Sequence, residues 1–135
     1  MRFQRQRITI MSTRRPPLDN VNQKLQWLGS SLGLFNLRDK DRSCFRIFIE
    51  IVKYGKNQQG LSSDEIAYRL HLTRGTVIHH INKLIESGVV IPDGKRYVMR
   101  VQNLHELVDE IEKDLIRTCD DLKKIANEID QWIGH

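Results

Sequence analysis

Residues 61–100 read LSSDEIAYRLHLTRGTVIHHINKLIESGVVIPDGKRYVMR, and this stretch decides the fold. A serine followed by acidic residues predicts a short helix that starts at Ser63, because both features stabilise a helix N-terminus. After a short turn, Thr73 caps a second predicted helix that stops before Gly88. Two strand-like runs then flank PDGK, and Asp-Gly between such runs predicts a β-hairpin.

Two more helices are predicted before this stretch, over residues 19–33 and 39–54. The first has one apolar stripe, whose spacing matches a single helix face: Val21, Leu25, Leu28 and Leu32. The second is apolar over most of its circumference, which indicates a helix at the centre of the core. Its main apolar face comprises Phe45, Phe48, Ile49 and Val52, widened by Ile47 and Ile51.

From Asn103 onward the pattern changes to that of one long amphipathic helix. Apolar residues recur in alternating steps of four and three, broken only by Thr118, as in the seam of a coiled coil. Such a stripe outside a domain core predicts a homodimer, and packing back onto the same domain is the alternative. The candidate dimerisation residues are Leu104, Val108, Ile111, Leu115, Leu122, Ile125, Ile129 and Trp132.

The order of these elements predicts a mainly α protein, a winged helix-turn-helix with a two-stranded β-hairpin wing and flanking dimerisation helices. Four segments follow from this order: a basic flexible arm (residues 1–18), an N-terminal helix (19–37), the winged helix-turn-helix domain (38–101) and a long coiled-coil-like helix (102–135).

The quoted stretch also resembles the winged-helix regulators of the ArsR and MarR type, most closely archaeal-looking members. The resemblance rests on the run from LSSDEIAYRL through TVIHHINKLIESGVV to the wing, and it covers residues 39–101. It implies a transcriptional regulator that binds double-stranded DNA and dimerises through its terminal helices. Many ArsR-type proteins are metal sensors, but the cysteine pair expected near the start of the recognition helix is absent here.

The formal net charge of +5 is distributed unevenly along the chain. Residues 1–18 contain five arginines and no acid, and residues 38–101 contain twelve basic and seven acidic side chains. Residues 102–135 reverse this balance, with four basic and nine acidic side chains. The basic arm and middle indicate a polyanionic partner, and an uneven but merely solvated surface is the alternative.

In a helix-turn-helix the N-terminal part of the second helix meets base edges in the major groove. Arg74 can offer two donors to guanine, Gly75 permits close approach, and Ile78 can meet a thymine methyl or the core edge. The wing carries Lys95 and Arg96 toward phosphates or the minor groove. The arm arginines either add minor-groove contacts or have no role. The candidate DNA-binding residues are Thr73, Arg74, Gly75, Thr76, Ile78, His79, Lys83, Lys95 and Arg96.

Adjacent histidines in that helix, His79 and His80, raise the question of a metal site. The helix face predicted to meet the core comprises Val77, Ile81 and Leu84. At 100° per residue, His80 falls on the flank of this face and His79 points away from it, so we expect no shared metal ion. Cys44 and Cys119 have no Cys or His at ligand spacing. We therefore expect no metal or other cofactor, and two reduced thiols.

Several classes of protein are not expected from this sequence. No run approaches the ~18 apolar residues of a membrane span, and the basic N-terminus lacks the apolar core of a secretory signal. We therefore expect a cytoplasmic chain that does not bind membranes. Paired carboxylates, a phosphate loop and a Ser/His/Asp arrangement at usable spacing are absent, so no enzyme is expected. The rival functions are a protein–protein interaction module and a nonspecific architectural DNA-binding protein.

Overall fold

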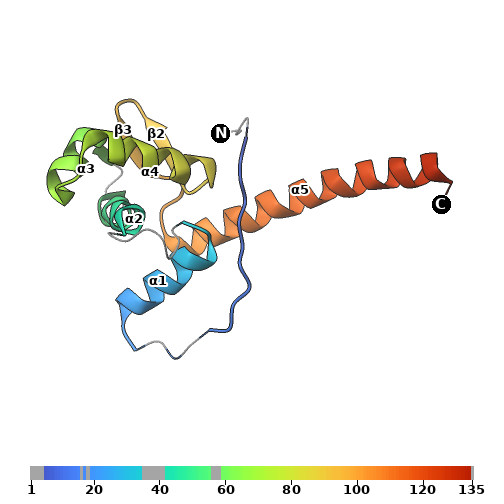
Figure 1. The fold of residues 1–135 in the computed structure, drawn as a ribbon, viewed down its shortest axis with the longest axis horizontal. Helices are drawn as coiled ribbons and strands as arrows, with labels where there is room; N and C mark the ends of the chain where they lie inside the picture. Colours follow the sequence, from blue (N-terminus) through green and yellow to red (C-terminus); the bar gives the residue numbers. More distant parts are fainter. Residues whose placement is uncertain (1–4, 16, 18, 35–41, 56–58, 135) are drawn as a thin grey trace.

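The computed structural model describes residues 5–15, 17, 19–34, 42–55 and 59–134. Its elements are, in order, α1 (Val21–Ser31), α2 (Ser43–Gly55), β1 (Leu61–Ser62), α3 (Ser63–Leu70), α4 (Arg74–Glu86), β2 (Val90–Asp93), β3 (Arg96–Met99) and α5 (Leu104–Ile133). Helices α2, α3 and α4 and the strands form one compact body, from which the C-terminal half of α5 projects (Figure 1). This architecture is the predicted mainly helical winged helix-turn-helix.

Helices α3 and α4 begin where capping side chains satisfy their first backbone N–H groups. The cap of α3 is Ser62, one residue before the predicted start, and its Oγ accepts a hydrogen bond from the Glu65 N–H at 3.1 Å. The Glu65 carboxylate accepts the Ser62 N–H in return, which completes a capping box. The cap of α4 is Thr73, as predicted, and its Oγ1 accepts from the Thr76 N–H.

The turn between α3 and α4 is made by His71, whose φ of 56° places it in the left-handed region. This conformation ends α3, because a left-handed residue cannot continue a right-handed helix. Helix α4 then packs against the core through the face that the sequence predicts. Val77, Ile81 and Leu84 are all fully buried.

Within the part of the chain that the structure describes, the sheet has three strands in the order β1-β3-β2, one more than predicted. The hairpin of β2 and β3 pairs Val90 with Met99 and Asp93 with Arg96, so Gly94 and Lys95 form its turn. The additional strand, β1, is only two residues long and pairs Leu61 with Tyr97. A two-residue strand carries no periodic pattern, which is why sequence analysis does not find it.

Helix α2 begins at Ser43, later than the predicted start at Asp39, which lies outside the described residues. Arg42 has a φ of 54° and therefore cannot belong to the helix. The most deeply buried face of α2 comprises Cys44, Ile47, Phe48 and Ile51. The predicted face is thus rotated, and Ile49 and Val52 are only half-buried. In α1, the predicted stripe holds for Leu28 and Leu32, but Val21 is exposed.

Residues 5–15 of the predicted flexible arm form an extended segment that crosses α5 and leads to α1 (Figure 1). The Arg7 N–H donates to the Glu86 carbonyl at 2.9 Å, and the Met11 N–H donates to the Ser31 carbonyl at 2.8 Å. Gly88 lies directly beneath the arm, since a Cβ added there would meet the Gln6 side chain. The arm therefore connects the C-terminal end of α4 with the end of α1.

The first part of α5 is held to the body by a buried carboxylate, Asp114, whose side chain is only 3% exposed. Arg100, at the end of the wing, donates to Asp114 through two nitrogens, at 2.5 and 3.2 Å. Gln6 of the arm donates at 2.9 Å, and Arg117 of α5 pairs with the same group. Asp114 therefore connects α5 to the end of the wing and to the arm.

The pKa of Asp114 reflects opposing influences. Burial of the carboxyl raises its pKa, but hydrogen bonds from Arg100 and Gln6 and the charges of Arg100 and Arg117 lower it by more. The result is a pKa below the ordinary value. The hydrogen bond with Asp114 is also the main reason that the pKa of Arg100 is raised. Folding therefore favours the charged form of both partners.

Replacing Asp114→Asn should lower the free energy of unfolding by about 3 kcal/mol at pH 7, because it leaves the partly buried Arg100 without its main acid. Urea unfolding at one protein concentration measures the difference. Asp120→Asn is the matched control, because Asp120 is exposed on the same helix, and it should change stability by no more than about 0.5 kcal/mol. Equal stability of the two variants would show that α5 does not depend on this pair.

The same comparison has a defined pH dependence. A carboxyl whose pKa is lowered on folding stabilises the protein above its unfolded pKa of about 3.9, and loses this effect as the pH falls through the folded value. The stability difference between the wild type and Asp114→Asn should thus be constant between pH 7 and about pH 5 and should narrow below about pH 4. Urea series at these pH values measure it, and narrowing already above pH 5 would contradict the assignment.

Candidate nucleic-acid interface

The first turn of α4 is the most open part of the helix-turn-helix. Thr73 and Arg74 are exposed, and the Thr73 hydroxyl donates to the Thr76 hydroxyl at 2.8 Å. Gly75 is also exposed, and a Cβ added there would meet no atom within 4 Å. Packing within the chain therefore does not require glycine at this position. The turn presents short side chains and one long cation on the outside of the body.

Arg74 is oriented by a weak contact with α3. Its Nε lies 3.5 Å from the Asp64 carboxylate, and both side chains are largely exposed. An exposed ion pair of this kind contributes between about 0 and 1 kcal/mol. Arg74 can therefore exchange Asp64 for another anion, such as a phosphate, at little cost. Asp64 lies in the first turn of α3, where a negative charge is also favoured by the helix dipole.

The outward face of α4 continues the open turn. His79 and Lys83 are exposed, whereas Thr76 and Ile78 are half-buried at its edges. The burial of Val77, Ile81 and Leu84 fixes this orientation, because these residues occupy the opposite face. The α4 residues proposed from the sequence therefore lie together on one surface, with Ile78 partly turned toward the core.

The two histidines differ in exposure, as the helix geometry predicts. His79 is exposed and His80 is half-buried. Their rings nevertheless meet edge to face, with centroids 5.2 Å apart and planes at 64°. Among the described residues, no three His, Cys, Asp or Glu side chains are grouped as metal ligands would be.

The wing separates its two basic residues. Lys95 lies in the exposed turn of the hairpin, next to Gly94, whose φ of 64° suits glycine. Arg96 instead turns back to the body, where it donates to the Gly60 carbonyl at 3.1 Å and pairs with Glu65 at 3.2 Å. The backbone hydrogen bond from Ser62 is the main cause of a lowered pKa for Glu65. Lys95 is thus the more accessible cation of the wing.

Helix α3 adds residues that sequence analysis does not single out. Tyr68 is 85% exposed, which is unusual for a large aromatic side chain. The neighbouring Arg69 places its guanidinium 4.2 Å from the centre of the Tyr54 ring. Arg46 of α2 donates to the Leu70 carbonyl at 2.6 Å and so supports the end of α3. In a helix-turn-helix the first helix crosses the phosphate backbone, where Tyr68 and Arg69 are suitable contacts.

Comparison with known proteins identifies the same part of the chain. Residues 49–91 match a family model described as winged helix-turn-helix DNA-binding. This range contains the second half of α2, all of β1, α3 and α4, and the start of β2. No curated protein matches the chain, and no solved structure does. The family match and the exposed face of α4 together support binding of double-stranded DNA by this winged helix-turn-helix.

Proposed function

We propose that the chain is a sequence-specific transcriptional regulator that binds double-stranded DNA as a homodimer. The observation that carries this proposal is the exposed N-terminal turn of α4, which stands on a fully buried face of the same helix. In this proposal α4 enters the major groove and the wing contacts phosphates or the minor groove. The narrower assignment to the ArsR and MarR type is also proposed, and the order of wing and terminal helices supports it.

The exposed residues divide by the contact each can make. Arg74 has a planar group that matches the two acceptors of guanine, so it is the candidate for reading a base. Thr73, Thr76 and His79 can donate to bases or to phosphate oxygens beside it. Lys83 and Lys95 are long point charges at the edges of the surface and suit phosphates. Arg96 acts mainly as a support for the wing, through its contacts with Gly60 and Glu65.

The homodimer is supported by the distal part of α5. Leu122, Ile125, Ile129 and Trp132 are exposed along one face of that helix. Leu104 and Ile111, which the sequence places in the same stripe, pack against the core of their own chain. The stripe thus has a dual role, with its first residues anchoring α5 and its later residues available to a partner. A homodimer would address two DNA half-sites about 34 Å apart or a multiple of it.

Fluorescence anisotropy against duplexes from the gene's own upstream region and against a scrambled duplex tests the proposal. Specific binding should be tighter on the upstream DNA and should weaken as salt rises. Equal affinity for both duplexes would favour a nonspecific architectural protein. No binding to either at low salt would favour a protein–protein interaction module, with the exposed face of α5 as its working surface.

Replacing Arg74→Ala should weaken binding to the preferred duplex by about 1–3 kcal/mol and should relax specificity at one base pair. Anisotropy titrations with single-base variants of the duplex measure both effects. Lys124→Ala is the charge-matched control, because it removes one positive charge from the exposed far part of α5. If Arg74→Ala binds all duplexes as the wild type does, α4 does not read the major groove in this way.

Replacing Lys95→Ala should weaken binding to all duplexes about equally, because a phosphate contact carries no sequence information. The slope of log affinity against log salt should become shallower by about one. A salt series on the preferred and scrambled duplexes gives both values. An unchanged slope would mean that the turn of the wing does not contact the DNA backbone.

A further inference from the structure

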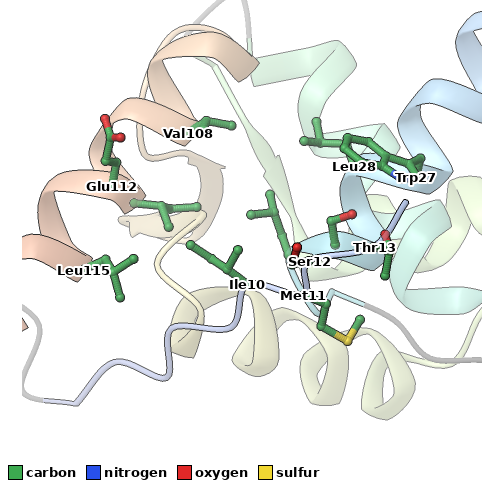
Figure 2. Close-up of a pocket in the computed structure, with 12 residues that line it drawn as sticks. Ile10, Met11, Ser12, Thr13, Trp27, Leu28, Val108, Glu112 and Leu115 are labelled. Carbon is green, nitrogen blue, oxygen red and sulfur yellow. The ribbon is translucent and has the colours of Figure 1, made fainter. Parts of the chain in front are cut away.

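The arm, α1 and α5 enclose a largely apolar hollow of about 460 Å³. Ile10 of the arm lies between the two helices, with Val108 and Leu115 on the α5 side and Trp27 and Leu28 on the α1 side (Figure 2). Ile111 also lines the hollow but is only 3% exposed, so its side chain forms part of the floor. The hollow therefore opens where the anchored part of α5 becomes the projecting part.

The apolar stripe of α5 passes through this hollow and continues to the end of the helix. Its first position, Leu104, packs against the core of its own chain. The positions from the hollow onward are Val108, Ile111, Leu115, Thr118, Leu122, Ile125, Ile129 and Trp132. The steps between them are three, four, three, four, three, four and three, an order that is identical in both directions. Two copies of α5 that run antiparallel and cross at Asp120 therefore bring each position from Val108 to Trp132 level with another, and Ile129 then lies above the buried Ile111. Val108 then faces Trp132, and Leu115 faces Ile125.

We propose that a second copy of this chain pairs its α5 with this one in antiparallel fashion and inserts its Trp132 into the hollow. The inference rests on the homodimer of the proposed function and specifies its interface. The two-fold axis would pass near Asp120, and each copy would fill the hollow of the other. Such an interface is isologous, since the same residues contribute from both copies.

The sizes of the facing side chains favour this arrangement. Trp132 is the largest side chain of the stripe and is 87% exposed in the single chain. It would lie opposite the smaller Val108, with the hollow beside it to receive the indole. Large side chains pack well when they meet small ones across an interface. In a parallel pair, Trp132 would face Trp132 of the other copy, and both hollows would stay open.

The apolar surface that each copy could bury in this dimer is of the order that a stable dimer needs. A buried tryptophan removes about 150–250 Å² from water, and a specific interface buries about 800 Å² on each partner. Each copy would contribute Trp132 together with the exposed stripe residues Leu115, Leu122, Ile125 and Ile129. At 1.5 Å per residue, the two equivalent Val108 residues would lie about 36 Å apart along the helix pair. The two DNA-binding bodies would then occupy opposite ends of it.

Cross-linking distinguishes the two directions of pairing. Leu115→Cys and Ile125→Cys are each introduced into a chain that carries Cys119→Ala, and Cys44 is buried. Antiparallel pairing predicts a covalent dimer under mild oxidation only when the two variants are mixed, because residue 115 of one copy faces residue 125 of the other. Each variant alone should stay uncross-linked, since its two thiols would be about 15 Å apart along the helices.

Docking of Trp132 is tested separately by sedimentation equilibrium. Trp132→Ala should weaken the dimer at least tenfold. Ile116→Ala is the matched control, because Ile116 is 54% exposed on α5 but lies outside the stripe, and it should leave dimer affinity unchanged. Circular dichroism verifies that all variants fold.

Four results would overturn the inference in distinguishable ways. Cross-linking of each variant with itself would establish parallel pairing and leave the homodimer intact. If Trp132→Ala dimerises with the affinity of the wild type, the indole does not occupy the hollow of the partner. A monomer at every concentration would reject the homodimer itself, while the DNA titrations judge the α4 surface independently. A monomer that takes up an apolar dye in the hollow would assign that space to a small molecule.

Discussion

The arrangement of this chain depends on one buried carboxylate. Asp114 joins α5 to the end of the wing through Arg100 and to the distant arm through Gln6, and Arg117 of the same helix also pairs with it. Taking a carboxylate out of water is expensive, and only charged and hydrogen-bonding partners offset the cost. Residues 100–103 join β3 to α5, so the pairing of Arg100 with Asp114 helps to set the direction in which α5 leaves the body.

A second group of ion pairs acts on the surface where DNA would bind. The first turn of α3 supplies Asp64 to Arg74 and Glu65 to Arg96. Each acid stabilises α3, because negative charge is favoured at a helix N-terminus. Each also pairs with an arginine from another element. The two pairs differ in how firmly they restrain their arginines. Arg74 is only weakly restrained, whereas Arg96 also binds the Gly60 carbonyl and links the wing to the start of α3.

Features that repeat locally can be predicted from the sequence, whereas contacts between distant residues cannot. The buried face of α4 and the caps and turns of the helix-turn-helix follow from periodicity and from residue preferences, and the structure confirms Val77, Ile81 and Leu84. The two-residue strand β1 has no period to detect. From the sequence, Arg96 is interpreted as a DNA-contacting cation of the wing. Its partner, Glu65, lies 31 residues earlier, so no local pattern predicts the ion pair. The contacts of the arm depend equally on residues that no local pattern connects.

The long separation in sequence between the arm and its partners also affects when the arm contacts can form. Gln6 is separated from Ser87 by 81 residues and from Asp114 by 108. The arm is therefore synthesised long before the residues that it binds, and its contacts close only after α4 and the start of α5 exist. Contacts of such long sequence separation slow folding, because the intervening chain must be ordered first. The two hydrogen bonds of Gln6 therefore close only when most of the chain between their partners is in place.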